Sequence, residues 1–363
     1  TSVADLFYQI LRLNKIPVAS IGTLGIKYNG KLKKTSLTSP DTISIHKNLQ
    51  ILKKKRIENV IIETSSHGLD QKRLHHIKFK GGIFTNFSQD HLDYHKSMNS
   101  YLNSKLVLFR EILAKKTSII SDREIQQFSI LQKIAKKRSL KIFDINEELK
   151  RITNISNEQV SDFKIKNLAM AIQGAKLCGV KEKEIYEVIE KIKDVDGRLE
   201  LVRKFQNDIK VFVDYAHTPD ALLKTLDFLK TKYGNNISLV FGCGGERDKK
   251  KRPLMAQIAN KKCKKVYITD DNPRNENPKN IRNELKKFIP KNKCFDFDSR
   301  SLAIRNAIRY ADPQEIILIA GKGHEQTQIY KNKILNISDK KIVKDLKLRI
   351  KKISKKNQNF IQN

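Results

Sequence analysis

The sequence predicts an α/β protein with two domains, each built on a mostly parallel β-sheet. Strand-like apolar runs alternate with amphipathic helical stretches along most of the chain. Four such runs in the second half each end in a cluster of polar and charged residues. The 363 residues leave room for two domains with cores of their own, and a hydrophobic content of 39% is typical of a globular protein.

The first half alternates between expected helices and expected strands. Apolar side chains at helical spacing predict helices over residues 3–13, 45–55, 100–115, 165–177 and 183–192. Short apolar runs predict strands over residues 18–21, 60–62, 82–85 and 117–121. A polar segment with a glycine, Lys193 to Arg198, follows the last helix. We expect the domain boundary there, which gives domains of residues 1–196 and 197–363.

In the second half, each of four expected strands delivers a polar loop at its carboxyl end. The strand and loop pairs are residues 211–213 with 214–220, 239–241 with 242–248, 265–269 with 271–274, and 316–319 with 320–325. Ligands of open α/β sheets bind outside the carboxyl ends of parallel strands, so these loops should face one crevice. Thr218 is expected to cap a helix that begins at Pro219, with leucines 222, 223, 226 and 229 facing inward.

Composition argues against several classes of protein. No apolar run approaches the roughly 20 residues of a membrane span, and residues 1–5 lack the basic and apolar regions of a secretory signal. The four cysteines form no C-x-x-C pair, which fits reduced thiols in a cytoplasm. The net charge of +34 is spread over the whole chain. We therefore attribute it to composition bias rather than to nucleic-acid binding.

Two polar clusters in the first half carry candidate metal ligands. Glu63 opens a loop after an expected strand, where a carboxylate is a suitable Mg²⁺ ligand beside nucleotide phosphates. Residues 85–95 form a second cluster after the next strand. His91 alone could equally be a hydrogen-bonded structural histidine, but its place beside Glu63 favours a ligand. Lys105, next to Leu106 on the following helix, would on composition alone be a surface lysine.

Seven motifs follow one another along the chain: residues 63–69 with Gln71 and Arg73, and residues 90–95, 197–200, 214–220, 242–248, 271–274 and 321–325. In type and order they resemble the motifs of the Mur ligases, and the resemblance extends over residues 1 to about 346. The resemblance implies a central P-loop-type ATPase domain with a mostly parallel sheet, followed by a Rossmann-like domain that binds an amino acid.

The resemblance also assigns site residues position by position. It implies Glu63, His91 and carbamylated Lys105 as the Mg²⁺ ligands and catalytic residues. ATP contacts would be Thr1, Asn86, Asn167, Arg198 and Asp214. Contacts to a UDP-muramoyl substrate would be Thr38, Ser39, Ser65, Gln71 and Arg73. The pocket for meso-diaminopimelate would comprise Arg247, Asp271, Asn272, Pro273, Arg274, Gly321 and Glu325.

The chemistry of diaminopimelate supports the last assignment independently. This amino acid differs from lysine by a carboxylate on its distal carbon, which an arginine fork binds in bidentate fashion. Glu325 and Asp271 would hold its ammonium groups. The implied activity is ATP-dependent ligation of meso-diaminopimelate to the D-glutamate carboxylate of a UDP-N-acetylmuramoyl dipeptide, through an acyl phosphate, in peptidoglycan precursor synthesis. A cytoplasmic monomer is expected.

The sequence also departs from the family pattern. Thr1 and Ser2 correspond to the end of the phosphate loop G-T-N-G-K-[ST], and the given chain does not include its glycines and lysine. We therefore expect a fragment that binds ATP poorly and does not turn over alone. Residues 143–163 are shorter than the corresponding stretch. Lys164 stands where the family usually has asparagine, and Lys250 stands where it has glycine.

Two alternatives remain at the level of the sequence. One is a related amide ligase such as folylpolyglutamate synthetase, against which residues 65–68 and 271–274 argue. The other is a non-catalytic remnant that binds a polyanion through its lysines. The set of remaining site residues argues against that alternative, because electrostatic binding does not require them.

Overall fold

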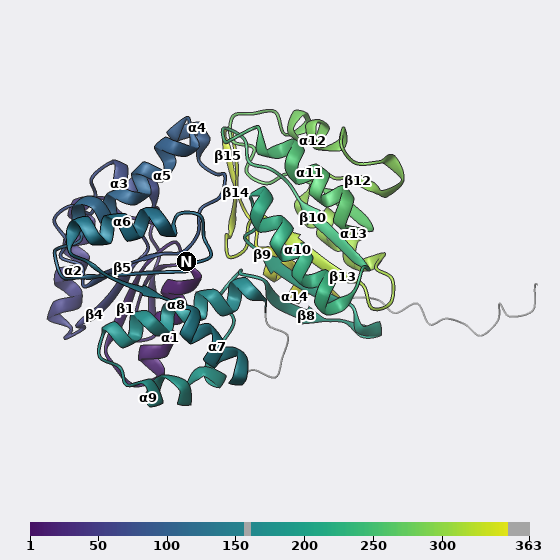
Figure 1. Cartoon of the computed structure of the whole chain (residues 1–363). Coiled ribbons are helices and arrows are strands. Elements are labelled where there is room, and N and C mark those ends of the chain that lie inside the picture. The colour runs from purple at the N-terminus through teal and green to yellow at the C-terminus, as the bar shows by residue number, and fades with distance from the viewer. Residues whose placement is uncertain (156–160, 348–363) are drawn as a thin grey trace, which may run out of the picture.

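The structure, a computed structural model, describes residues 1–155 and 161–347. Figure 1 shows two lobes, with the purple to teal first half on one side and the green to yellow second half on the other. Below, "first domain" and "second domain" mean the parts before and after the predicted boundary at residues 196/197, which stays a prediction. The expected shortening at residues 143–163 lies partly outside the described residues.

The first domain carries two β-sheets. One has the strand order β3-β2-β1-β4, with β1 Val18–Gly22, β2 Gly25–Tyr28, β3 Lys31–Lys33 and β4 Asn59–Ile62. The other has the order β5-β6-β7, with β5 Gly81–Phe84, β6 Ser118–Ser121 and β7 Lys141–Asp144. The pairs β1–β4, β5–β6 and β6–β7 are parallel, as expected. The pairs β1–β2 and β2–β3 are antiparallel because their short turns cannot join parallel strands.

Helices cover these sheets. They are α1 Ser2–Leu13, α2 Thr42–Lys54, α3 Ser66–Asp70, α4 Leu92–His95, α5 Met98–Val107, α6 Phe128–Arg138, α7 Asn146–Ile155, α8 Asp162–Leu177 and α9 Glu182–Glu187, with a 3-10 turn at Ile189–Lys191. Helices α1, α2, α5, α8 and α9 lie near the predicted positions, whereas α3, α4, α6 and α7 were not predicted. The helix expected over residues 100–115 ends earlier. After α5 it continues as a π-helical turn, Leu108–Ile112, and Leu113 is already extended.

The second domain is a six-stranded sheet of order β12-β11-β10-β13-β9-β8. Its strands are β8 Glu200–Lys204, β9 Lys210–Asp214, β10 Ile237–Phe241, β11 Lys265–Ile268, β12 Cys294–Asp296 and β13 Ile316–Ala320. All neighbours pair in parallel except β8, which is antiparallel to β9. The four strands that were expected to deliver polar loops are therefore adjacent, in the order β11-β10-β13-β9.

Helices lie on both faces of this sheet, as in a Rossmann-like fold. They are α10 Pro219–Tyr233, α11 Lys251–Lys262, α12 Pro278–Lys286, α13 Arg300–Arg309 and α14 Asp339–Asp345, with 3-10 turns at Gln206–Asp208 and Lys291–Lys293 and a hairpin of β14 Thr327–Tyr330 and β15 Lys333–Asn336. Thr218 caps α10 by accepting from Ala221 N at 3.3 Å, as predicted. Leu222, Leu226 and Leu229 are buried, but Leu223 is only half-buried.

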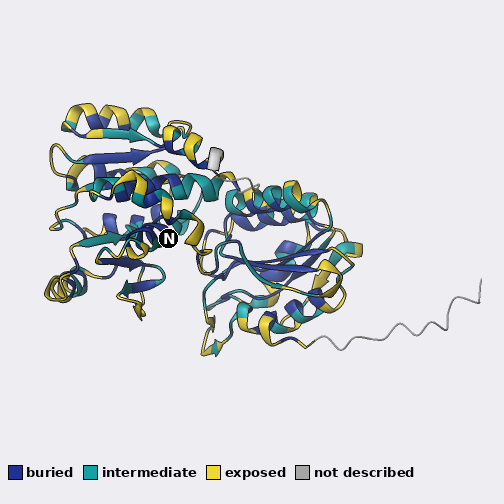
Figure 2. Cartoon of the chain, turned by 90° about the horizontal axis from the view of Figure 1, so that it is seen from below, coloured by how far each residue is buried: buried dark blue, intermediate teal, exposed yellow. Residues whose placement is uncertain are grey.

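The inner strands of the second sheet consist almost entirely of buried residues, which appear as dark blue strands in Figure 2. Leu239 and Phe241 of β10 pack in a cluster with Leu222 of α10, whereas Val240 packs in a second cluster with Ile304 of α13. This alternation follows from the period of two in a β-strand. Because the sheet is covered on both faces, its strand ends are the places left for a site. Within the described ranges, no helix is long and apolar enough to cross a membrane.

Candidate active site

The carboxyl ends of β9, β10, β11 and β13 meet at one edge of the second sheet, as predicted. Gly245 N donates to Asn272 O at 2.9 Å and so ties the loop after β10 to the loop after β11. Gly321 N donates to Asp214 O at 3.1 Å and ties the loop after β13 to the end of β9. The four loops therefore form one continuous polar surface.

Two glycines permit this close approach of the loops. A Cβ at Gly245 would lie 1.9 Å from Pro273 O, a distance that no other residue could tolerate. Gly321 has a φ of +109°, and a Cβ there would lie 2.8 Å from Asp271 Oδ2. Both positions thus need glycine for a local reason, which explains the glycine-rich composition of the two loops.

Two arginines lie on one side of this surface. Arg274 has a left-handed backbone, with φ +53°, and its Nη1 donates to Gly245 O at 2.8 Å and to Asn272 O at 3.2 Å. Within the described residues, no protein group accepts a hydrogen bond from its Nη2 or Nε. Burial, together with the charge of Arg247, lowers the pKa of Arg274. Two neighbouring guanidinium groups with free donors suit an anionic ligand.

Carboxylates and an amide lie beside the arginines. Asn272 Nδ2 donates to Glu325 Oε2 at 3.1 Å, and Tyr215 OH donates to Glu325 Oε1 at 3.3 Å. Asp271 lies against the loop after β13 at Gly321. The structure therefore brings together all the residues predicted for the diaminopimelate pocket: Arg247, Asp271, Asn272, Pro273, Arg274, Gly321 and Glu325.

A cavity of about 870 Å³ lies between the two domains. All five residues predicted to contact ATP line it: Thr1, Asn86, Asn167, Arg198 and Asp214. Lys105, Asp90 and His217 line it as well. Asp214 is held by Leu199 N at 3.0 Å and by Thr225 Oγ1 at 2.8 Å, so its carboxylate is fixed at the cavity wall. The volume falls in the range of small-molecule and cofactor sites.

Glu63 follows β4, and threonine side chains surround its carboxylate. Thr1 Oγ1 donates to Oε1 at 2.7 Å, and Thr23 donates from N to Oε2 and from Oγ1 to Oε1, both at 2.9 Å. Burial raises the pKa of Glu63, whereas the hydrogen bonds from the Thr1 side chain and from Thr23 lower it. These donors favour the ionised carboxylate, which is a suitable oxygen ligand for a divalent cation.

Lys105 lies within electrostatic range of both Glu63 and His91, and among the described residues no hydrogen bond or ion pair joins any two of the three. Burial lowers the pKa of His91 to about 4, although Asp90 opposes the shift, so its imidazole is neutral and can bind a metal. Burial also lowers the pKa of Lys105, against the charges of Asp90 and Glu63, and its Nζ lies 5.1 Å from the centre of the Tyr101 ring. Over the described ranges, no three His, Cys, Asp or Glu side chains gather closely enough to hold a metal ion.

The residues predicted for the UDP-muramoyl substrate form one cluster beside Glu63. Ser39 Oγ donates to Glu63 O at 3.0 Å and accepts from Ser65 N at 2.8 Å. Arg73 Nη1 donates to Ser39 O at 2.8 Å, and its Nη2 donates to Gln71 Oε1. Thr38 Oγ1 is bonded to Thr23 Oγ1 at 3.0 Å. Through Ser39, this cluster is hydrogen-bonded directly to Glu63, the candidate metal ligand.

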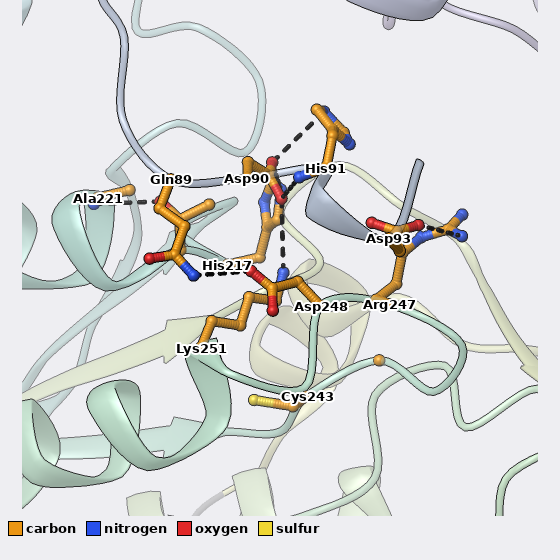
Figure 3. Close-up of polar contacts among 12 residues, drawn as sticks. Gln89, Asp90, His91, Asp93, His217, Ala221, Cys243, Arg247, Asp248 and Lys251 are labelled. Carbon is orange, nitrogen blue, oxygen red and sulfur yellow. Dashed lines mark hydrogen bonds and ion pairs between the residues drawn. The ribbon is translucent and has the colours of Figure 1, made fainter. Parts of the chain in front are cut away.

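Figure 3 shows a polar cluster that joins the two domains across the cleft. Asp90 Oδ2 accepts from His217 Nε2 at 3.2 Å, and Asp90 Oδ1 lies 3.8 Å from Lys251 Nζ. Gln89 Nε2 donates to Asp248 Oδ2 at 2.8 Å. Burial would raise the pKa of Asp90, but the hydrogen bond and charge of His217, with the charge of Lys251, lower it overall. The loop after β5 is thus ionically bound to the second domain.

Sequence reasoning did not predict the contacts within this interdomain cluster, nor that Lys322 is buried behind the amino-acid pocket. Asp90 and His217 belong to motifs that the sequence highlights, but their pairing joins residues 127 positions apart. Arg247, which was predicted only for the amino-acid pocket, also lies 3.6 Å from Asp93 of the first domain. No local pattern reveals such contacts, because they form only when the domains meet.

Lys164, which differs from the family pattern, bridges to the segment at the predicted domain boundary. Its Nζ donates to Asp194 Oδ1 at 2.7 Å and to Leu199 O at 3.2 Å. Nearby Asn167 still lines the interdomain cavity. The substitution therefore places a cation between helix α8 and the boundary segment, beside the wall of the predicted nucleotide site.

Comparison with known domain families gives two matches along the chain. The Mur ligase middle domain matches residues 1–185, and the Mur ligase glutamate ligase domain matches residues 197–323. The matches fall on the two lobes of the structure. Together they cover most of the chain.

Curated relatives agree with these matches. A UDP-N-acetylmuramoyl-L-alanyl-D-glutamate–2,6-diaminopimelate ligase of Buchnera aphidicola subsp. Schizaphis graminum is 37% identical, over 97% of this chain and 76% of that protein. The protein of the same name from Rickettsia montanensis is also 37% identical, over 95% of this chain and 77% of that protein. The similarity therefore extends across both domains.

Solved structures show the same relationship at the level of the fold. A UDP-N-acetylmuramoyl-L-alanyl-D-glutamate–2,6-diaminopimelate ligase has a TM-score of 0.60 and 27% identity, and the match covers 95% of this chain and 75% of that one. A folylpolyglutamate synthase/dihydrofolate synthase of Yersinia pestis, complexed with AMPPNP and Mn, has a TM-score of 0.70 at 14% identity, and the match covers 89% of this chain and 83% of that one. The second likeness shows a shared fold alone. By its sequence and its structure, the chain belongs to the Mur ligase family.

Proposed function

We propose that this protein ligates meso-diaminopimelate to the D-glutamate carboxylate of UDP-N-acetylmuramoyl-L-alanyl-D-glutamate, with ATP as co-substrate, in peptidoglycan precursor synthesis. The observation that carries this proposal is the pairing of cationic and anionic groups in one pocket. Arg274 and Arg247 lie on one side, and Asp271 and Glu325 lie beside them. Diaminopimelate carries ammonium and carboxylate groups at both ends, so it matches this pattern of charge.

The arginine side of the pocket explains why diaminopimelate would be preferred over lysine. The distal carboxylate can accept from the free donors of the Arg274 fork in bidentate geometry. Lysine has no group at that position and would leave those buried donors unpaired, which costs several kcal/mol of discrimination in comparable sites. The pocket therefore supports selection by a charge that only one of the two amino acids carries.

The interdomain cavity supports an ATP site. Asp214 and Arg198 of the second domain and Asn167 of the first domain all line it. A nucleotide there would contact both domains at once. Transfer of its γ-phosphoryl group to the D-glutamate carboxylate would give an acyl phosphate, and attack by the amine of diaminopimelate would then form the amide and release phosphate.

The donor atoms beside the cavity fit a divalent cation such as Mg²⁺. Glu63 supplies an ionised oxygen, His91 supplies a neutral imidazole, and Lys105 would supply a carbamate oxygen. When bound, the ion neutralises negative charge on the phosphoryl group during its transfer. Glu63 and its threonine partners would fix the position of this charge relative to the cluster around Ser39, which we propose as the holder of the UDP-muramoyl substrate.

Carbamylation of Lys105 is consistent with its lowered pKa. The neutral amine attacks CO₂ and loses one proton, which leaves a carbamate anion on Nζ. We expect Lys105→Ala to lose ligase activity and to recover part of it when a short carboxylate such as acetate is added. The control is Lys115→Ala, an exposed lysine after the π-helical turn. Full activity of Lys105→Ala without added carboxylate or bicarbonate would disprove the carbamate.

The reaction itself is tested on the intact protein, that is, a form that also includes the phosphate-loop glycines and lysine, with ATP, the UDP-muramoyl dipeptide and meso-diaminopimelate. Mass spectrometry should detect the UDP-muramoyl tripeptide, and phosphate should be released in equal amount. Parallel reactions contain L-lysine, or dihydrofolate with L-glutamate. A folate product, or no product with any amino acid, would contradict the proposal. A cytoplasmic location and a monomeric state remain predictions.

A further inference from the structure

Lys322 is a buried lysine in the loop after β13. Its side chain is 1% exposed, although lysine side chains are rarely buried without a partner. Its Nζ donates to Glu325 Oε2 at 2.8 Å and to Asn272 Oδ1 at 3.2 Å. Both partners belong to the proposed diaminopimelate pocket, but Lys322 itself is almost closed to solvent. It therefore supports the pocket from behind and does not line it.

These contacts fix the orientation of the Asn272 amide. Asn272 Oδ1 accepts from Lys322 Nζ and also from Ile329 N at 2.9 Å. Because both donors occupy the oxygen side of the amide, the Nδ2 side must face Glu325, where it donates to Oε2 at 3.1 Å. Lys322 thus acts on Glu325 twice, directly and through Asn272.

The two carboxylate oxygens of Glu325 consequently differ. Oε2 accepts from Lys322 and Asn272, whereas among the described residues Oε1 accepts only one long hydrogen bond, of 3.3 Å from Tyr215 OH. The Glu325 side chain is 29% exposed, in contrast to that of Lys322. Oε2 is therefore occupied by the protein, and Oε1 is the oxygen that remains for a ligand.

We propose that Lys322 is a positioning residue that holds Glu325 with Oε1 directed at an ammonium group of the incoming amino acid. The inference rests on the proposed function, because it assumes that an amino acid binds in this pocket. Lys322 also compensates the charge of Glu325. Without the lysine, the carboxylate would lose its fixed orientation and its buried partner, and breaking one half of such a pair is costly.

The test measures steady-state kinetics of the intact protein with Lys322→Met, which keeps the length of the side chain and removes its charge and donors. We expect the KM for meso-diaminopimelate to rise about tenfold or more, as for the loss of a hydrogen bond to a charged group. The KM values for ATP and for the UDP-muramoyl dipeptide should change less than about twofold, since those sites lie elsewhere. Lys331→Met, at the exposed turn between β14 and β15, is the matched control.

A double-mutant cycle with Glu325→Gln separates positioning from a general structural effect. If Lys322 acts through Glu325, Lys322→Met should add little to the KM in the Glu325→Gln background. Lys322→Arg keeps the charge and should give an intermediate KM, and it carries the test if Lys322→Met melts below the assay temperature. An unchanged or lowered KM in Lys322→Met, or fully additive effects, would overturn the inference. Failure of the wild-type protein to use diaminopimelate would instead refute the proposed function.

Discussion

The site residues on the two sides of the cleft differ in whether they are bonded to one another. On the second-domain side, Asn272, Lys322 and Glu325 bond directly to one another. On the first-domain side, Glu63 is bonded to threonines, and His91 lies beside Asp90. Within the described residues, Glu63, His91 and Lys105 share no bond. The amino-acid pocket is thus preorganised, whereas each of the three candidate catalytic residues interacts with a different set of neighbours.

This difference has a physical origin in the fold. The amino-acid pocket is built on four adjacent strands of one sheet, whose backbone hydrogen bonds fix the loops at their ends. The candidate metal ligands come from β4, from the loop after β5 and from α5, and the structure describes these strands in separate sheets. We expect a bound metal ion and nucleotide to bring the candidate metal ligands of the first domain together. We expect the selectivity for the amino acid to depend on the second domain.

The largest effect is expected on the first-domain side. Glu63→Gln removes the ionised oxygen and should lower turnover about 10³-fold, as in other sites where one electrostatic group is lost. The KM for diaminopimelate should stay the same, because its pocket is on the other domain. Initial rates of phosphate release measure both quantities. Glu58→Gln, an exposed glutamate near β4, is the control. A raised KM with unchanged turnover would reverse our assignment of the two sides.

The next largest effect is expected in the amino-acid pocket. Arg274→Lys keeps the charge but loses the planar fork, so the KM for meso-diaminopimelate should rise about 10²-fold while turnover changes little. The preference over L-lysine should fall by a similar factor, as competition between the two amino acids would show. Arg309→Lys, an exposed change on α13, should have no effect. If Arg274→Lys kept the preference for meso-diaminopimelate over L-lysine, the arginine fork would not be the source of that preference.

The interdomain cluster connects the two sides, and we expect an intermediate effect there. Asp90→Asn removes the charge that faces Lys251 and weakens the hydrogen bond with His217, so the contact between the two domains should weaken. The KM for ATP should rise about tenfold, within the usual range of coupling between sites, and small-angle scattering should show a larger radius of gyration. Asp312→Asn, in an ion pair within the second domain, is the control. An unchanged radius and KM would show that the cluster does not hold the domains together.

The smallest effect concerns pH. Burial, followed by the charge of Arg198, lowers the pKa of His324 below its ordinary value of 6.5, although Glu325, Asp196 and Glu63 oppose the shift. The unfolded chain therefore takes up this proton more readily than the folded chain, and stability falls as the pH drops below 6.5. Melting temperatures between pH 7 and pH 5 should fall less steeply in His324→Asn than in the wild type. An identical slope, or one changed equally by exposed His76→Asn, would contradict this assignment.

Much of the second domain could be predicted because its signals are local. Each strand ends directly before its polar loop, as residues 265–274 illustrate, and parallel strands must place those ends at one edge. The short strand β3 was missed because Lys31–Lys33 is exposed and has no apolar pattern. The buried position of Lys322 was also missed, since nothing in the residues beside it reveals that its side chain turns inward.

The site that depends on both domains was predicted only in part. The residues around the cavity were identified one by one through the family resemblance, and they do line a single cavity. The pairing of Asp90 with His217, by contrast, depends on how two separately folded units dock. Neither helical nor strand periodicity carries information about that docking, so structure was needed to find it.

The measurement that tests the preorganised pocket most directly is a crystal structure of the protein with bound meso-diaminopimelate, beside one without it. We predict that the distal carboxylate contacts Arg274, that an ammonium group contacts Glu325 Oε1, and that the distance from Lys322 Nζ to Glu325 Oε2 stays near its ligand-free value of 2.8 Å. An amino acid bound elsewhere, or a Glu325 that leaves Lys322 to reach its ligand, would contradict the account.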